Sequence, residues 1–276
     1  MQTDNALFQR FQKACTIIKQ PAEVFTVAKK QGKKPAKKSS EKDNKKDQDQ
    51  PKEAESSAAE IEKNLPKDVQ DRLKKIKAEL EDFQKQVVKR FDKYIMGVSL
   101  LPPQKDKDGN EVDKSKINVL VLVDDSDSQK MSKDELKQKL QSIIQKTAEG
   151  IDKNIVPQAV LLSEVWQSCY DSKYDMLQLI AMGAPIYDTG MLAAIKISEI
   201  HKSMVLKKFE KYIVSYVLAG SLVQGRATKS SDIDVFVVID DTDVKRMTRA
   251  ELKDKLRAII IGMGIEAGEM TGVKNK

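Results

Sequence analysis

The sequence has little cysteine and no long apolar run. Its 276 residues include two cysteines, Cys15 and Cys169, which lie far apart in the chain. Two such cysteines provide neither a disulfide framework nor the closely spaced ligands of a metal site. No apolar run approaches the roughly 20 residues that a membrane-spanning helix needs, and residues 1–10 lack the pattern of a signal peptide. These absences predict a soluble protein of a reducing compartment, the cytoplasm, with no membrane partner.

Histidine and tryptophan occur once each, as His201 and Trp166. His201 lies in a basic stretch with helical character, which favours a surface or helix role over general acid–base catalysis. No second aromatic residue at strand spacing accompanies Trp166, so packing in a core or domain interface is favoured over base stacking.

Lysine, by contrast, is in excess. The formal net charge is +7, and much of it falls between Lys29 and Lys52, a stretch nearly free of apolar residues. Such a composition predicts a disordered, lysine-rich linker over residues 21–57. The stretch suits a nucleic-acid-binding tail, a localisation signal or a solvated spacer. Its interspersed acids and its lack of aromatic residues favour the spacer.

Helical periodicity is found on both sides of this linker. Residues 6–18 place their apolar side chains on one face, which predicts a short amphipathic docking helix within residues 1–20. Over residues 58–90, apolar side chains recur every three or four positions among charged ones. That pattern predicts a long helical arm whose apolar stripe forms a coiled-coil seam or packs on a neighbouring domain. These N-terminal helices are the candidate contact sites for a protein partner.

The clearest candidate site lies in two apolar runs within residues 212–240, joined by a basic, glycine-bearing loop. The first run ends at Gly220 and Ser221, and after ten residues the second begins with Asp232 and Asp234. Alternate residues of a strand share a face, so the two carboxylates are predicted to lie on the same side, roughly 7 Å apart.

These residue types suit phosphate chemistry. Oxygen ligands favour magnesium, which two carboxylates can share and substrate phosphates complete. Gly220 lets a phosphate approach the backbone, and the Ser221 hydroxyl and the following amides can donate to its oxygens. The neighbours Phe236 and Val238 are predicted to be buried, which makes an uncompensated acid pair beside them costly. The pattern therefore indicates phosphoryl or nucleotidyl transfer.

The Gly-Ser pair, the ten-residue gap and the Asp-Ile-Asp between apolar residues resemble the signature of the DNA polymerase beta-like nucleotidyltransferase superfamily. The motifs 225–227 (Gly-Arg-Ala) and 230–234 (Ser-Ser-Asp-Ile-Asp) resemble its minimal branch in particular. The resemblance implies that Asp232 and Asp234 hold Mg²⁺ in a two-metal site. It also implies that Gly220 and Ser221 hold the triphosphate of a nucleoside triphosphate.

The loop between these motifs adds three nucleotide-binding candidates, Arg226, Lys229 and Ser231. Cations in this position can meet phosphate charge. For Arg226 and Lys229 the alternative is that they keep a surface loop soluble.

A segment before the site repeats part of its sequence. Residues 117–144 align without gaps on residues 233–260, with 14 of 28 positions identical at an offset of 116. Residues 91–95 echo residues 209–213 at an offset of 118. Both copies keep a strand, an acidic turn and a helix that opens with a capping box. The sequence therefore predicts an internal duplication.

The first copy lacks the chemistry of the second. Lys116 and Asn118 stand where Asp232 and Asp234 would align, and 102–103 (Pro-Pro) replaces the Gly-Ser pair. Because a lysine cannot bind magnesium, this copy is predicted to be catalytically inactive.

The second copy lacks a counterpart of the strand expected near residues 155–162, where the superfamily usually carries a third acid. Either the sequence is a fragment whose continuation supplies that strand, or the first copy lends an edge to the second. The open edge that would otherwise remain favours a fragment.

The predicted fold is α+β, with an α/β-type mixed sheet and flanking helices. The resemblance adds a duplicated nucleotidyltransferase fold that follows the helical arm, with a degenerate domain over residues 91–190 and a motif-bearing domain over residues 191–276. The implied function is magnesium-dependent transfer of a nucleoside monophosphate to an acceptor hydroxyl on a protein, a small molecule or an RNA end. Two alternatives stay open: a non-catalytic tandem scaffold or nucleotide-binding regulatory protein, and an RNA-associated protein that uses the lysine-rich linker.

Overall fold

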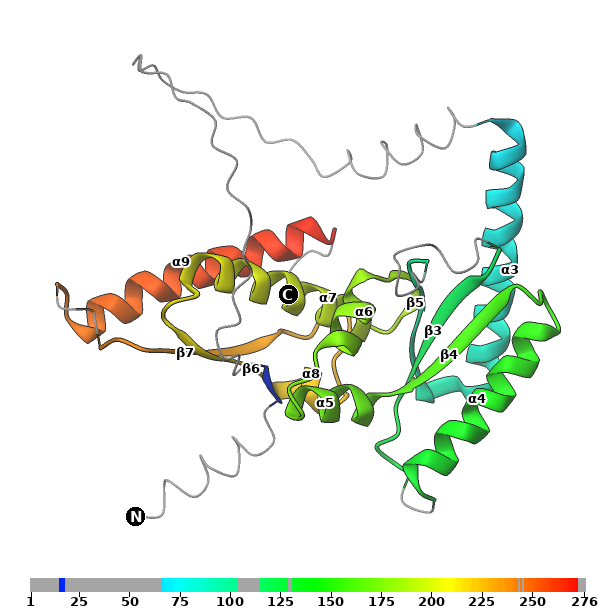
Figure 1. Ribbon diagram of the computed structural model, residues 1–276, viewed down its shortest axis with the longest axis horizontal. Helices are drawn as coiled ribbons and strands as arrows, with labels where there is room; N and C mark the ends of the chain where they lie inside the picture. Colours follow the sequence, from blue (N-terminus) through cyan, green and yellow to red (C-terminus); the bar gives the residue numbers. More distant parts are fainter. Residues whose placement is uncertain are drawn as a thin grey trace, which may run out of the picture.

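The computed structural model describes residues 15–17, 66–103, 115–128, 131–242, 244 and 246–272 (Figure 1). The predicted linker and the greater part of the predicted N-terminal helix lie outside these residues. Within them the fold is α+β, with a mixed sheet and flanking helices, which confirms the predicted class.

Strands and helices alternate along most of the chain. The strands are β1 (Cys15–Ile17), β2 (Ile95–Leu100), β3 (Ile117–Val123), β4 (Ile155–Leu161), β5 (Ala184–Asp188), β6 (Ile213–Ala219) and β7 (Asp234–Ile239). The helices are α3 (Lys67–Phe91), α4 (Lys133–Glu149), α5 (Leu162–Tyr170), α6 (Asp175–Met182), α7 (Met191–Phe209), α8 (Gly220–Val223) and α9 (Arg249–Met270), and a 3₁₀ turn (Asp92–Tyr94) follows α3.

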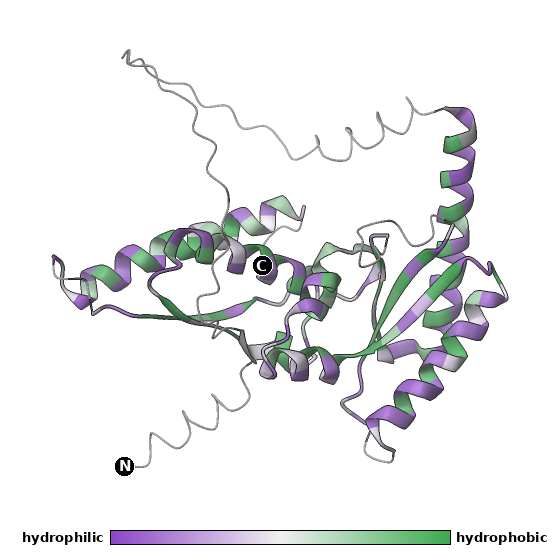
Figure 2. Ribbon diagram, viewed as in Figure 1, coloured by the Kyte–Doolittle hydropathy of each residue, from purple (hydrophilic) through white to green (hydrophobic). Residues whose placement is uncertain are grey.

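The first sheet has four strands in the order β4-β3-β2-β5, of which β3 and β4 are parallel and the other pairs antiparallel. Helices α3 and α4, striped with hydrophilic and hydrophobic residues, cover one face (Figure 2). Helices α5, α6 and α7 cover the other face. Because both faces are covered, β3 is fully apolar in its centre, and Leu120 and Leu122 are completely buried.

Helix α3 forms most of the predicted arm. Its apolar stripe, with Leu80, Phe83 and Val87 buried, packs on the first sheet. Of the two uses predicted for the stripe, the described residues therefore show packing on a neighbouring domain. Residues 58–65 of the predicted arm lie outside the described part of the chain.

The second sheet has three antiparallel strands in the order β1-β6-β7. Val235 and Val237 of β7 point into the core, together with Tyr216 and Leu218 of β6. The prediction that Phe236 and Val238 are buried is wrong, because 54% and 43% of their surfaces are exposed. No described helix covers their face as α5–α7 cover the corresponding face of the first sheet.

Strand β1 corrects another prediction. Residues 15–17 were expected to lie in an amphipathic helix, but they pair with β6, with Cys15 opposite Leu218 and Ile17 opposite Tyr216. An unpaired sheet edge gains backbone hydrogen bonds from any segment that can reach it, and that gain outweighs local helical periodicity.

The β2–β3 and β6–β7 hairpins agree in fine detail. In each hairpin the register shifts between the first residue pair and the next. Each also has an aspartate that accepts a backbone N–H in the turn, and a hydroxyl side chain that caps the following helix. The matching contacts are the pairs Ile95–Val123 and Ile213–Ile239, the bonds from Ser126 N to Asp124 (2.9 Å) and Thr242 N to Asp240 (3.0 Å), and those from Glu135 N to Ser132 and Glu251 N to Thr248 (both 3.2 Å).

One apolar core runs across the boundary predicted near residues 190 and 191. Helix α7 follows that boundary, and its Met191, Leu192 and Ile195 share a buried cluster with residues of both sheets. Trp166 of α5 is buried in the same cluster, as the packing interpretation predicted.

The outer edge of β7 carries no further strand in the described parts of the chain. The expectation that a continuation of the chain supplies one stays a prediction. Over the same residues, no helix is long and apolar enough to cross a membrane.

Candidate active site

Strand pairing brings Gly220 against Asp234. The last residue of β6, Ala219, is paired with Asp234, so the chain turns into α8 directly beside that carboxylate. Gly220 has φ +70°, and a Cβ built on it would overlap the Asp234 carboxylate and lie 2.9 Å from its Cγ. Both the backbone conformation and the lack of space therefore demand glycine here.

Asp232 and Asp234 are exposed, and an alternation of exposed and partly buried side chains runs unbroken from Asp232 to Asp240. The two acids consequently share the open face of the second sheet with Phe236 and Val238. Burial therefore does not require a cation beside them, because Phe236 and Val238 are solvated and do not dehydrate the carboxylates. What remains is an accessible pair of carboxylates next to a glycine-bearing turn.

Helix α8 is one turn long and is fixed by Leu222, which is completely buried. Ser221 is partly buried, and its carbonyl accepts the backbone N–H of Arg226 at 2.9 Å. A helix this short contributes little dipole, so any phosphate cradle here depends on the Gly220 turn and its neighbouring amides.

The loop from α8 to β7 packs on the rest of the molecule through glycines. Gly225 has φ +72°, and a Cβ on it would meet Leu162 at 2.7 Å. A Cβ on Gly190, just before α7, would meet the backbone of Thr228 and Lys229 at 2.3–2.6 Å. The loop that leads into the two carboxylates is thus held against the start of α7.

The three predicted loop residues have unequal positions. Ser231 accepts the backbone N–H of Thr228 at 2.9 Å, which closes the turn before Asp232. Arg226 is exposed and donates to the side chain of Gln224, and Lys229 is exposed. The structure gives Ser231 a role in shaping the loop and leaves both cations at the solvent.

Sequence reasoning missed Asp188, which positions α7. Its carboxylate accepts the backbone N–H groups of Gly190 (2.8 Å), Leu192 (2.9 Å) and Ala193 (3.0 Å). Asp188 stands two residues before the N-cap residue Gly190, so it lies outside the position that capping patterns in a sequence mark. Through Gly190, this cap also supports the loop of the candidate site.

His201 was expected at a surface or in a simple helix role, but it is buried, with 6% of its surface exposed. Its Nε2 lies 3.0 Å from the Ile260 carbonyl and its Nδ1 lies 2.9 Å from the Tyr216 hydroxyl. A carbonyl only accepts, so Nε2 carries the proton and Nδ1 accepts from Tyr216. Burial lowers the pKa of His201 and raises that of Tyr216, so both are neutral and tie α7, β6 and α9 together.

The donor set suits a hard divalent cation. Two accessible carboxylates beside a glycine turn offer oxygen ligands and room for substrate phosphates, which is how Mg²⁺ is commonly held. Among the described residues, no cluster of three histidine, cysteine or acidic side chains could hold a metal by itself. Substrate oxygens and water would have to complete the coordination.

A comparison with protein families bears on this stretch. Residues 198–263, which contain α8, the loop, β7 and most of α9, match the family model of the nucleotidyltransferase domain. The match includes Gly220, Ser221, Asp232 and Asp234. It supports a nucleotidyltransferase function and a nucleotide substrate for this segment. Neither the curated proteins nor the solved structures gave a match to the chain.

Proposed function

We propose that the chain is a magnesium-dependent nucleotidyltransferase that transfers a nucleoside monophosphate from a nucleoside triphosphate to an acceptor hydroxyl. The observation that carries the proposal is the contact between the Gly220 turn and the Asp234 carboxylate. It sets a surface on which a triphosphate can lie directly beside a pair of acids suited to a divalent cation.

In the proposed reaction, the backbone around Gly220 and the Ser221 hydroxyl bind the β and γ phosphates. Asp232 and Asp234 would hold Mg²⁺, which supplies charge neutralisation for the departing pyrophosphate and activation of the acceptor. The acceptor oxygen bonds to the α-phosphorus, the bond from that phosphorus to the bridging oxygen breaks, pyrophosphate leaves and the hydroxyl proton passes to water. Arg226 and Lys229, both at the solvent, are positioned to add positive charge once a triphosphate arrives.

We also propose that the two hairpins arose by duplication and that the first is inactive. Their shared registers, turns and caps support the common origin. Lys116 and Asn118 occupy the positions of the two aspartates, and α5–α7 fill the face on which a substrate would lie. The first unit would then serve as the platform on which α7 and the loop of the second are built.

Binding and transfer test the proposal separately. Isothermal titration of ATP with Mg²⁺ should show saturable binding to the wild-type chain and much weaker binding to Asp232→Ala/Asp234→Ala. Identical absence of binding in both proteins contradicts any nucleotide function. Binding without transfer from labelled nucleoside triphosphates would instead favour a nucleotide-binding regulatory protein. This is the second candidate function, because the face of the first unit is closed.

A further inference from the structure

The loop between α8 and β7, residues 224–231, leads directly into Asp232. Asp234 lies within β7 and is fixed by its pairing with Ala219, whereas Asp232 precedes the strand. The position of one carboxylate is therefore set by the sheet, and that of the other depends on where the loop ends. The separation of the two acids consequently depends on what holds the loop.

Near its start, the loop rests on helix α5. A Cβ on Gly225 would meet the side chain of Leu162, the first residue of α5, at 2.7 Å and would come within 4.0 Å of the Asp124 carboxylate. Leu162 and Ala227 of the loop are both buried and belong to the same apolar cluster. The first half of the loop is thus packed on the beginning of α5.

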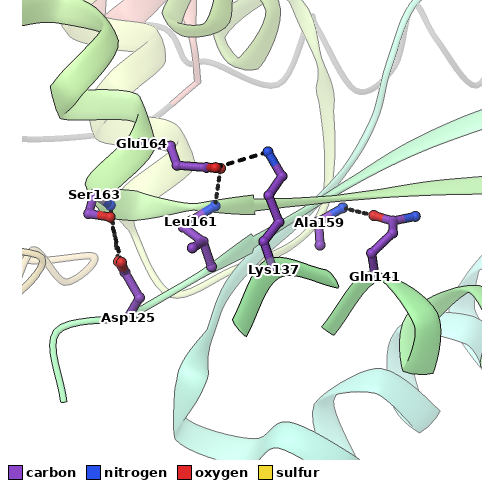
Figure 3. Close-up of polar contacts among 7 residues, drawn as sticks. All are labelled: Asp125, Lys137, Gln141, Ala159, Leu161, Ser163 and Glu164. Atoms are coloured by element: carbon purple, nitrogen blue, oxygen red, sulfur yellow. Dashed lines mark hydrogen bonds and ion pairs between the residues drawn. The ribbon is translucent and has the colours of Figure 1, made fainter. Parts of the chain in front are cut away.

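Figure 3 shows what fixes the beginning of α5. Asp125, which follows β3, accepts the backbone N–H of Ser163 at 3.0 Å and also accepts the hydroxyl of that residue. The Glu164 carboxylate accepts the backbone N–H of Leu161 at 3.2 Å. N–H groups at a helix start have no partner within the helix, so these two carboxylates satisfy them. They hold in place the helix start that carries Leu162.

Near its end, the loop rests on the beginning of α7. A Cβ on Gly190 would overlap the carbonyl group of Thr228. Asp188, the last residue of β5, accepts three backbone N–H groups at this helix start, that of Gly190 among them at 2.8 Å. Ser231 accepts the N–H of Thr228 at 2.9 Å and returns its own N–H to the Thr228 carbonyl at 3.1 Å. A continuous series of contacts thus runs from Asp188 to the residue before Asp232.

We propose that Asp125 and Asp188 are positioning residues for the candidate site. They fix the starts of α5 and α7, these two helix starts support the loop, and the loop sets Asp232 at the separation from Asp234 that a shared Mg²⁺ requires. Sites of this kind tolerate displacements of only about 0.5 Å. The inference rests on the proposed nucleotidyl transfer and gives the first unit a specific part in it, because its β3 turn and its strand β5 supply both carboxylates.

A cap also stabilises its helix, so a control must separate stability from positioning. Ser132 provides it, because its hydroxyl caps α4 by accepting the backbone N–H of Glu135 at 3.2 Å. Helix α4 packs on the face of the first sheet opposite to α5–α7. Ser132→Ala therefore removes a cap from the same unit on the side away from the loop.

The first measurement is the Mg²⁺ dependence of transfer from ATP by the full chain. Asp188→Ala should raise the Mg²⁺ concentration for half-maximal rate roughly tenfold, as loss of a group that supports metal ligands commonly does. The value for Asp188→Asn should lie between those of Asp188→Ala and the wild type, because the amide oxygen can still accept two of the three N–H groups. Ser132→Ala should lower the midpoint of urea unfolding and leave the Mg²⁺ requirement unchanged.

Asp125→Ala tests the other support of the loop. It should raise the Mg²⁺ requirement in the same direction as Asp188→Ala but by a smaller factor, because Glu164 still binds the start of α5. An unchanged requirement in Asp125→Ala would remove this residue from the proposal.

The second measurement is hydrogen exchange of the backbone amides of residues 224–232, which requires no catalytic activity. Asp188→Ala should accelerate their exchange roughly tenfold relative to the wild type, since the contacts that order the loop are lost. Ser132→Ala should leave it unchanged. If the wild type transfers no nucleotide, the proposed function is contradicted, and selective acceleration in Asp188→Ala would still support the role of this residue in holding the loop.

Two results overturn the proposal. Equal exchange of these amides in Asp188→Ala and Ser132→Ala would show that the Asp188 cap does not hold the loop. Faster exchange in an active Asp188→Ala variant whose Mg²⁺ requirement is that of the wild type would show that the loop does not set the two acids.

Discussion

The first and second sheets are built on the same hairpin and differ in what covers them. Leu120 and Leu122 of β3 are completely buried, whereas Phe236 and Val238 of β7, at the equivalent positions, are 54% and 43% exposed. The helices α5–α7 account for this difference, because they fill the space over β3 and leave the matching face of β7 open.

The two units differ in which faces are covered as well as in residue identity. The first hairpin carries Lys116 and Asn118 and has a closed face, while the second carries Asp232 and Asp234 on an open face. The same contrast holds at the edges: β4 pairs with β3 in the first sheet, whereas no strand among the described residues pairs with the outer edge of β7. A hairpin can therefore keep its register and caps while its faces take on different roles.

The largest expected effect is on catalysis by the exposed acids. Asp232→Ala/Asp234→Ala should lower the rate of transfer by at least roughly 1,000-fold, because the cation that neutralises the phosphates loses its ligands. The measurement is release of labelled pyrophosphate. The control, Lys116→Ala/Asn118→Ala, changes the same two positions of the first hairpin and should leave the rate near that of the wild type. An equal loss in both variants would show that the two hairpins do not differ in function.

The next effect is on stability and compares the two faces. Leu120→Ala should lower the free energy of unfolding by about 2–5 kcal/mol, since it opens a cavity in a covered core. Phe236→Ala should lower it by no more than about 0.5 kcal/mol, because the side chain is half exposed. Urea unfolding of both variants gives the difference. Similar costs would mean that the face of β7 is covered in solution.

A smaller effect concerns the turn between β6 and α8. Gly220→Ala should lower the free energy of unfolding by about 1–3 kcal/mol and also reduce transfer, because the new methyl group displaces the Asp234 carboxylate. Gly264 of α9 has open space around it, so Gly264→Ala should raise stability by up to about 1 kcal/mol without changing the rate. Thermal unfolding and rate measurements on both variants check this. Full activity in Gly220→Ala would separate the turn from the chemistry.

The smallest effect is a pH dependence at His201. Its pKa is lowered in the fold by burial, so the unfolded chain binds the proton more readily. Stability should be complete above about pH 6.5, the ordinary histidine value, and fall as the pH decreases from there towards the folded-state pKa, by at most about 1.4 kcal/mol per pH unit. Chemical unfolding between pH 7.5 and 5.5 measures the slope.

His201→Gln should remove that part of the slope. The first unit has the apolar Phe83 at the position 118 residues earlier. A titrating group at this position is therefore a feature of the second unit and not of the first. An unchanged slope in His201→Gln would assign the dependence to other groups.

Much of the fold and of the local geometry of the candidate site could be predicted from the sequence. The α+β class, the helix over most of the arm, the burial of Trp166 and the second hairpin with its capping box follow from periodicity and spacing between near neighbours. The turn at Gly220 and the shared face of Asp232 and Asp234 were also predicted in this way, because turns and alternation along a strand are set by local backbone geometry.

Which faces are covered could not be predicted from the sequence, because it depends on tertiary contacts. The exposure of Phe236, the burial of His201 between Tyr216 and Ile260, and the addition of β1 to β6 all depend on contacts between segments that lie far apart in the chain. A local pattern can say that one side of a strand is apolar, but it cannot say whether a helix arrives to cover that side. For this reason the sequence could predict the residues of the candidate site, while the openness of the site depends on how the elements pack.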